Sequence, residues 1–370
     1  MCNNWEKICK VGEWYMRNFD YEKLKTLAWD NEILSYIAKI HEYKGKQDLY
    51  LRQKPVELER LVQVAIRQST EASNSIEGIV TTNSRLKQLI EDKTMPQNRD
   101  EEEILGYQKV LNLIHQNYEM IPVKPNYILQ IHRDLLQFTS LSYGGHFKNV
   151  PNEIDAVLPD GKKLVLFRPL EPFETPDAVE RLCQNYNNAL MKEEIDSLIL
   201  IPCFILDFLC IHPFNDGNGR VSRLLTLLLL YRSGFIVGKY ISIEKAIADT
   251  KANYYDALTK SDLNWHEATN DPKPFIKYML GVILSCYREF ENRIIITEES
   301  GSKSTAYDIV KNYVLNTIGT FTKQDALICC PSLGSSSIEA SLKKLVEDGT
   351  ITRLGNGRNT QYVRSDALNN

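Results

Sequence analysis

Apolar residues recur at spacings of three and four along most of the 370-residue chain. This spacing is typical of α-helices that bury one face, so it predicts a mainly α fold. Two stretches are apolar on nearly all sides, and we expect both to be buried helices; they cover residues 197–211 and 224–230. Stretches with a single apolar face cover residues 58–66, 104–114, 127–136 and 179–190.

One segment carries the pattern of β-strands instead. Residues 154–158 and 163–167 are rich in apolar and β-branched side chains, and the turn sequence Pro-Asp-Gly at 159–161 lies between them. This pattern predicts a β-hairpin over residues 154–167. Because a lone two-stranded hairpin is at best marginally stable in water, we expect it to lie against helices.

The last part of the chain predicts a second, smaller domain. The composition turns polar between 292 and 305, with the run Glu-Glu-Ser-Gly-Ser-Lys-Ser at 298–304, which favours a linker. The pattern beyond it predicts three helices and then two strands, at 306–318, 323–327, 336–347, 350–354 and 360–364. Three helices followed by a two-stranded wing resemble a winged helix-turn-helix domain, and we assign this domain to residues 305–370.

Composition and charge exclude several classes of protein. A net charge of -4 gives no overall reason to expect tight nucleic-acid binding, because such binding needs clustered Lys and Arg. The most apolar run, 197–211, contains Pro202 and Asp207 and is well short of a membrane-spanning helix. The eight cysteines form no Cys-x-x-Cys pair, so no zinc site is expected. The first 17 residues lack an apolar signal core, so we expect a cytoplasmic protein with reduced thiols and no membrane contact.

A polar, glycine-rich loop joins the two most apolar helices, with the sequence Ile-His-Pro-Phe-Asn-Asp-Gly-Asn-Gly-Arg-Val-Ser-Arg at 211–223. We expect Gly217 and Gly219 to adopt positive φ and to bring backbone N–H groups close to an anion. The helix that follows adds the positive end of its dipole. The backbone of this loop therefore predicts a phosphate-binding site.

The side chains of the loop add the groups that transfer chemistry needs. Arg220 and Arg223 are three residues apart, so both can reach the phosphates of a nucleotide from the first helical turn. Asp216 can hold a Mg²⁺ ion that bridges phosphate oxygens. His212 has an intrinsic pKa of about 6.5, which suits removal of a proton from an attacking hydroxyl. These four side chains predict a phosphoryl- or nucleotidyl-transfer site.

The loop matches the Fic signature, His-x-Phe-x-Asp/Glu-Gly-Asn-Gly-Arg-x-x-Arg, at every defined position, and the chain resembles Fic proteins over about residues 50–290. The resemblance implies a Fic-type helical bundle with the hairpin as a flap. It implies transfer of AMP from ATP, with Mg²⁺, to a Ser, Thr or Tyr hydroxyl of a protein, including the protein itself. His212 is then the general base, Asp216 the Mg²⁺ ligand and Phe214 an inward-packing residue. The implied nucleotide contacts are Gly217, Asn218, Gly219, Arg220 and Arg223.

A second motif lies upstream, at the end of a predicted helix. The sequence Ser-Asn-Ser-Ile-Glu-Gly at 73–78 matches the inhibitory motif of Fic proteins, Ser/Thr-x-x-x-Glu-Gly/Asn. The resemblance implies that Glu77 pairs with Arg223 in the space of the γ-phosphate, because a carboxylate and a phosphate compete for one guanidinium. Ser73 is expected to support this inhibitory helix, at residues 66–78.

Further features follow from the resemblance. A protein substrate is expected to bind along the flap hairpin, 154–167, as an added strand. Tyr255 is expected in the adenine pocket. Lys148 stands where Fic proteins often have Arg, and His146 is expected to be structural. The chain then divides into a helical extension with the inhibitory helix at 1–100, a Fic catalytic core at 101–292 and the C-terminal domain.

Other functions stay open on sequence alone. One is a DNA-binding transcriptional regulator whose Fic core senses nucleotide, although such a sensor has no need of His212. The site also fits removal of AMP, with Glu77 positioning a water molecule, or a donor other than ATP, such as UTP. Residues 301–370 contain eight Lys or Arg and six Asp or Glu, so the C-terminal domain is expected to contact either DNA or protein, including a second copy of the chain in a homodimer.

Overall fold

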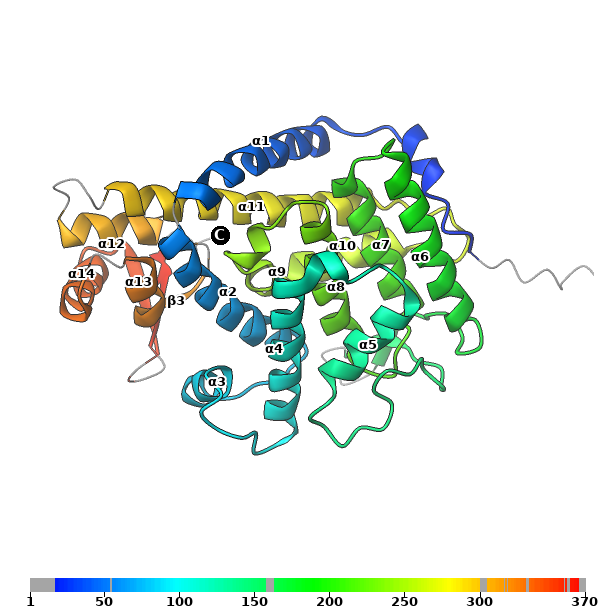
Figure 1. The fold of residues 1–370 in the computed structure, drawn as a ribbon, viewed down its shortest axis with the longest axis horizontal. Coiled ribbons are helices and arrows are strands. Elements are labelled where there is room, and N and C mark those ends of the chain that lie inside the picture. Colours follow the sequence, from blue (N-terminus) through cyan, green and yellow to red (C-terminus); the bar gives the residue numbers. More distant parts are fainter. Residues whose placement is uncertain are drawn as a thin grey trace, which may run out of the picture.

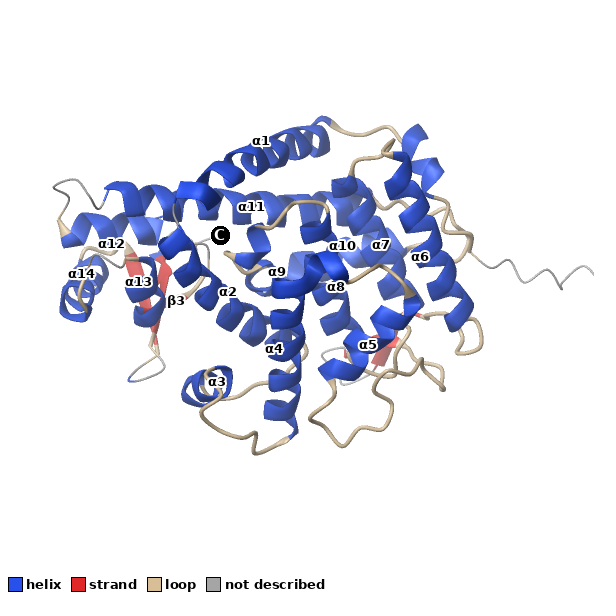
Figure 2. Ribbon diagram, viewed as in Figure 1, coloured by secondary structure: helices blue, strands red, loops and turns tan. Residues whose placement is uncertain are grey.

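The computed structural model describes residues 17–365, leaving out 54, 158–162, 300–304, 316, 318, 331, 332, 356, 358 and 359. Helices form most of this part of the chain, and its strands lie in two small sheets (Figure 2). The mainly α prediction is therefore confirmed. A large helical body carries a smaller C-terminal module at one end (Figure 1).

The body is built around two buried helices, α7 (Ser197–Ile211) and α8 (Asn218–Arg232), both expected from their all-round apolar sequence. The long helix α11 (Lys273–Glu299) packs against α7, and α1 (Asn31–Gln53) lies along α11 (Figure 1). The remaining helices of the body are α2 (Pro55–Ile76), α3 (Asn83–Ile90), α4 (Arg99–Asn117), α5 (Pro125–Leu135), α6 (Thr175–Lys192), α9 (Ile243–Asp249) and α10 (Lys251–Asp262), with 3₁₀ helices at Tyr21–Thr26, Tyr118–Met120 and Val237–Lys239.

A buried carboxylate anchors α7 within the body. Asp207 accepts hydrogen bonds from Trp265 Nε1 at 2.7 Å and from Tyr21 OH at 3.2 Å. Arg17 Nη2 lies 3.0 Å from the same carboxylate. Burial raises the pKa of Asp207, and the neighbouring Arg17 charge acts in the opposite direction. These contacts tie α7 to the N-terminal segment and to the loop after α10, so the loop that follows α7 starts from a rigid support.

The predicted hairpin is present as β1 (Ile154–Val157) and β2 (Lys163–Phe167), which pair antiparallel. Its predicted turn, at 159–161, lies outside the described residues. Phe167 is buried, and its ring meets the ring of Trp265 edge-on at 6.1 Å. The hairpin therefore lies against the helical body, as expected for so small a sheet.

The elements of the C-terminal module are α12 (Ala306–Leu315), β3 (Phe321–Thr322), α13 (Lys323–Cys329), α14 (Ser335–Glu347), β4 (Ile351–Leu354) and β5 (Gln361–Arg364). The strands form an antiparallel sheet in the order β3-β5-β4. This order is compatible with a winged helix-turn-helix domain, but that class, like the contact with DNA or protein, stays a prediction. The predicted linker is helical as far as Glu299, because α11 continues to that residue; its remainder, 300–304, lies outside the described residues.

Two expectations about the chain as a whole concern membranes and thiols. No helix in the described ranges is long and apolar enough to cross a lipid bilayer. The cysteines that the structure describes are buried and unbonded, as expected from their apolar surroundings; they are Cys183, Cys203, Cys210, Cys286, Cys329 and Cys330.

Candidate active site

The motif loop runs from the end of α7 to the first turn of α8. His212 ends α7 in the left-handed region with φ 50°, a conformation that is uncommon for residues with side chains and that often marks functional sites. Gly217 precedes α8 with φ 83°, as predicted. Gly219 instead lies inside α8 and does not adopt positive φ, so that prediction is wrong.

His132 on α5 supports the loop from one side. Its ring stacks on Phe214 with centroids 3.8 Å apart, and Phe214 is fully buried, as the sequence implied. His132 Nε2 donates to the carbonyl oxygen of Asp216 at 3.1 Å, while Nδ1 accepts from the backbone N–H of Gly145 at 3.1 Å. His132 could not be predicted from the sequence, because it belongs to no motif and reaches the loop only through the packing of α5.

Polar side chains from the loop itself and from the segment before the flap form hydrogen bonds with backbone groups of the loop. Lys148 Nζ donates to the Ile211 carbonyl oxygen at 3.0 Å and to Asn152 Oδ1 at 2.9 Å. Burial lowers the pKa of Lys148 to about 8. Asn218 Oδ1 accepts from Phe214 N at 2.9 Å, and Asn218 Nδ2 donates to the Phe214 carbonyl oxygen at 2.8 Å. Lys148 therefore holds the end of α7. The amide side chain of Asn218 is engaged within the loop, so any contact of this residue with a nucleotide would use its backbone N–H.

His212 is held as a neutral base. Its Nδ1 lies 3.2 Å from the Leu209 carbonyl oxygen. Because a carbonyl oxygen can only accept, Nδ1 carries the proton and Nε2 is the basic nitrogen. Burial lowers the pKa of His212 to about 4, and the positive charge of Lys148 acts in the same direction. At neutral pH the ring is therefore ready to accept a proton.

Arg223 is turned toward the end of α2. Its Nη2 lies 2.7 Å from Glu77 Oε1, so the ion pair expected from the sequence is present. Ser73 accepts from Arg223 Nε at its Oγ and from Nη2 at its carbonyl oxygen, both at 2.8 Å. Gly78 follows with φ 81°, which suits a glycine just past a helix end.

The Glu77 carboxylate lies against the N-terminal turn of α8. A Cβ on Gly219 would collide with Glu77 Oε1 and would lie 3.3 Å from Arg223 Nη1. The N-terminal turn of a helix, with its unpaired N–H groups, is where a phosphate prefers to bind. The Glu77 carboxylate therefore occupies an end of α8 that favours anions, and Gly219 is required for this close approach.

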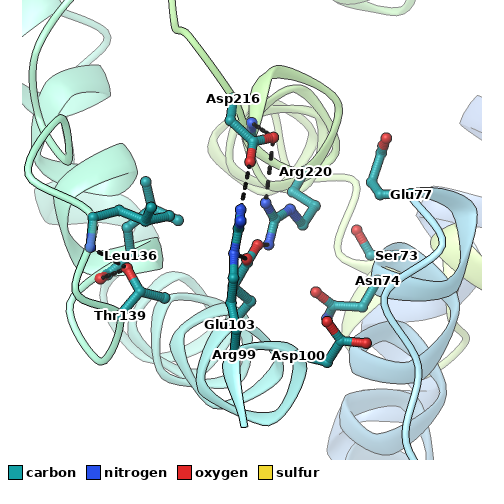
Figure 3. A network of polar contacts seen from close by, with 12 residues as sticks. Ser73, Asn74, Glu77, Arg99, Asp100, Glu103, Leu136, Thr139, Asp216 and Arg220 are labelled. Atoms are coloured by element: carbon teal, nitrogen blue, oxygen red, sulfur yellow. Dashed lines mark hydrogen bonds and ion pairs between the residues drawn. The ribbon is translucent and has the colours of Figure 1, made fainter.

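A network of four charged side chains lies on the other side of the loop (Figure 3). Arg220 is 1% exposed, and its Nη1 lies 2.5 Å from Glu103 Oε2. Arg99 Nε lies 2.6 Å from Glu103 Oε1, and Arg99 Nη2 lies 3.2 Å from Asp216 Oδ2. The sequence reasoning singled out Arg220 and Asp216 but missed Arg99 and Glu103, whose sequence signal is no more than an i,i+4 charge pair on one helix.

Asp216 fits a Mg²⁺ ion that arrives with a nucleotide. Its side chain is 43% exposed, and Mg²⁺ is typically held by one or two carboxylates together with substrate phosphates and water. Within the described ranges, no group of three or more His, Cys, Asp or Glu side chains could hold a metal ion. A Mg²⁺ ion held by Asp216 would take its other ligands from phosphate oxygens and water.

Tyr255 on α10 stays a prediction for the adenine pocket. Its side chain is exposed, and its ring meets Tyr254 edge-on at 5.3 Å. Lys251, one turn earlier on α10, donates to the carbonyl oxygen of Ile76 at 2.7 Å, which ties α10 to the end of α2. An exposed aromatic ring beside the Glu77 segment is compatible with stacking of a base.

Comparison with known proteins finds a family model that matches part of the chain. Residues 122–230 match the model of the Fic/DOC family. The chain is 24% identical over 234 residues to the protein adenylyltransferase Fic of Nematostella vectensis and 25% identical over 271 residues to that of Drosophila erecta. The matches cover 60% and 71% of this chain, and 48% and 47% of the relatives. The chain thus spans about half the length of the curated relatives it matches.

Solved structures share the architecture. A Fic family protein from Desulfovibrio desulfuricans G20 matches with a TM-score of 0.57 at 20% identity, over 91% of this chain and 97% of that chain. Fic-1 from C. elegans matches with a TM-score of 0.56 at 20% identity, over 73% and 74%. At these identities the likeness concerns the fold, and it confirms the predicted helical architecture.

Proposed function

Because this chain contains a Fic domain, we propose that the protein is a nucleotidyltransferase that moves AMP from ATP onto a Ser, Thr or Tyr hydroxyl of a protein. The observation that carries the proposal is the pairing, within one loop, of a neutral imidazole at His212 with the anion-binding end of α8. A protein that only sensed nucleotide would need the anion site but not the base. The names of the curated relatives support the same reaction class.

In the proposed reaction, the target hydroxyl oxygen attacks the α-phosphorus of ATP, the bond between the α-phosphorus and its bridging oxygen breaks, and pyrophosphate leaves. His212 Nε2 takes the hydroxyl proton. The backbone N–H groups at the start of α8 receive phosphate oxygens, as helix N-termini do. Arg223 receives the γ-phosphate once Glu77 has moved away. Asp216 would hold a Mg²⁺ ion, which when bound would neutralise phosphate charge.

We propose that the protein substrate pairs with the flap. β1 and β2 form a two-stranded sheet, so each strand has an edge whose backbone groups can pair with an added strand. Val165 and Leu166 on β2 have exposed side chains. Pairing of this kind uses mainly backbone hydrogen bonds, so it places a hydroxyl without demanding a particular target sequence.

The donor and the target can be identified in one experiment. Glu77→Gly protein is incubated with a cell lysate and, in separate reactions, with ATP, UTP or CTP, and modified peptides are then found by mass spectrometry. We expect addition of AMP to Ser, Thr or Tyr, on a target and on the protein itself, in the ATP reaction. If modification occurs in the UTP or CTP reaction instead, that nucleotide is the donor rather than ATP. A folded variant that binds ATP but modifies nothing would overturn the transfer reaction. So would loss of AMP from modified peptides that are incubated with the parent protein, which keeps Glu77.

The pH dependence of transfer is expected to follow His212 as a base. With its pKa lowered to about 4, the ring is deprotonated above that pH, so activity should be lost as pH falls through about 4 and should stay level above about pH 5. With an ordinary histidine as base, transfer activity would instead be lost below about pH 6.5. The measurement is kcat/KM for transfer against pH, which reports the groups of the free enzyme. A midpoint near the ordinary value would contradict a His212 base whose pKa is lowered.

A further inference from the structure

The carboxylate proposed to hold Mg²⁺ already has positive neighbours in the protein (Figure 3). Asp216 Oδ2 lies 3.2 Å from Arg99 Nη2, and Asp216 Oδ1 lies 3.8 Å from Arg220 Nη2. Asp216 Oδ1 also accepts from the backbone N–H of Gly217 at 2.6 Å. Each carboxylate oxygen that could bind the ion is therefore engaged with a positive or donor group from the protein itself.

The two arginines differ in their freedom to move. Arg220 is 1% exposed and is paired with the buried Glu103. Movement of the Arg220 guanidinium would separate it from the Glu103 carboxylate and leave two buried charges without partners, which is strongly unfavourable. Arg99 also contacts Glu103, with its Nε 2.6 Å from Oε1. Its side chain is 57% exposed, and Glu103 keeps Arg220 as a partner, so the Arg99 guanidinium can turn from Asp216 into solvent without leaving a buried charge unpaired. Arg99 is thus the neighbour of Asp216 that can move away from it.

From this geometry we propose that Arg99 is a positioning residue that competes with Mg²⁺ for the carboxylate of Asp216. The Arg99 guanidinium lies at hydrogen-bond distance from Oδ2, so it occupies space beside the oxygen that would bind the ion. Its charge also repels a doubly charged ion at a few ångströms. Arg99 must therefore swing away when the ion and the nucleotide bind, and it raises the Mg²⁺ concentration that binding requires. The inference rests on the proposed function, because it concerns the same nucleotide site.

This contact is separate from the Glu77 contact. Glu77 pairs with Arg223 and lies against Gly219, at the place proposed for the γ-phosphate. Arg99 instead pairs with Asp216. Removal of Glu77 should therefore open the phosphate site and leave the contact with Asp216 in place. The effect of Arg99 can be measured in a protein that already lacks Glu77.

The test measures binding rather than turnover. In the Glu77→Gly background, binding of α,β-methylene ATP, which cannot lose pyrophosphate, is titrated calorimetrically at a series of Mg²⁺ concentrations. Arg99→Met keeps the length of the side chain and removes its charge, and it should lower the Mg²⁺ midpoint by about three- to tenfold, the size expected for loss of a partly exposed ion pair and of one nearby positive charge. Arg99→Lys keeps the charge and should stay close to the parent protein.

Lys109→Ala is the matched control. Lys109 is also on α4 and has its Nζ 3.3 Å from Asp92 Oδ1, away from the motif loop. It removes one positive charge from the same helix and should leave the midpoint unchanged. An unchanged midpoint in Arg99→Met, or weaker nucleotide binding at every Mg²⁺ concentration, would overturn the inference while leaving the proposed function standing. If the Glu77→Gly protein itself bound no nucleotide at any Mg²⁺ concentration, that result would instead contradict the proposed function.

Discussion

Replacement of His212 by alanine is expected to lower the rate of AMP transfer by about 100- to 10,000-fold, the usual contribution of a general base, while nucleotide binding is retained. The two effects separate because different groups provide them. The proposed base is His212 Nε2, which is fixed by the hydrogen bond from Nδ1 to the Leu209 carbonyl oxygen, whereas the proposed phosphate site consists of the start of α8 and Arg223. Transfer is measured with ATP labelled at the α-phosphate, and binding with α,β-methylene ATP, both in the Glu77→Gly background.

His146→Ala is the matched control for this substitution. His146 is an exposed histidine on the segment that leads to the flap, so its loss should leave the transfer rate close to that of the parent. If His212→Ala protein labelled its target at the parent rate, another group would have to remove the proton. If it lost nucleotide binding as well, His212 would belong to the phosphate site rather than act as a base.

The motif loop could be predicted from the sequence because its functional groups are neighbours in the chain. His212, Asp216 and Arg223 are carried by one short segment between two apolar helices, so their proximity needs no knowledge of the fold. Even there one inference failed. Gly219 was expected to adopt positive φ, but its role is to let the carboxylate of Glu77 lie against the backbone of α8, and a contact with another segment cannot be read from local sequence.

The supporting residues could not be predicted for the same reason. Arg99 and Glu103 on α4 and His132 on α5 reach the loop only because those helices pack beside α8. In the sequence they are ordinary polar residues on amphipathic helices. Long-range contacts, rather than any motif, give them their place in the site.

The fold shows a similar division. α7 and α8 could be predicted because an all-round apolar helix can only be buried. The strand β3 could not, because it has two residues and exists through its pairing with β5. α11 extends beyond the point where the sequence becomes polar, as far as Glu299. Polar composition alone therefore placed the start of the linker too early.

Under the proposed inhibition by Glu77, only a small movement is needed to release it. Glu77 follows α2, and the preceding part of that helix is anchored: Arg67 pairs with the buried Asp325 of α13, and Ser73 holds Arg223. The Glu77 side chain itself is 32% exposed. Displacement of the last turn, or of this one side chain, is therefore enough to free the space beside Gly219.

Replacement of Glu77 by glycine is accordingly expected to raise the rate of AMP transfer, including self-modification, by about 10- to 100-fold. That range corresponds to one hydrogen bond between charged groups, the contact from Glu77 to Arg223 that a γ-phosphate must displace. Glu77→Gln keeps the shape but not the charge of the side chain, so it should give a smaller increase. The measurement is the initial rate of label transfer at an ATP concentration well below KM, for the two variants and the parent protein.

Ser75→Gly separates loss of the carboxylate from a loosened helix end. Ser75 is an exposed residue in the last turn of α2, where its Oγ donates to the Ala72 carbonyl oxygen at 2.9 Å. Glycine at this position loosens the same turn and leaves the Glu77 carboxylate in the protein. If Ser75→Gly activated transfer as strongly as Glu77→Gly, flexibility of the turn would be the cause. If Glu77→Gly bound ATP normally but transferred no faster than the parent, the ion pair with Arg223 would be structural, and something other than this carboxylate would set the resting activity.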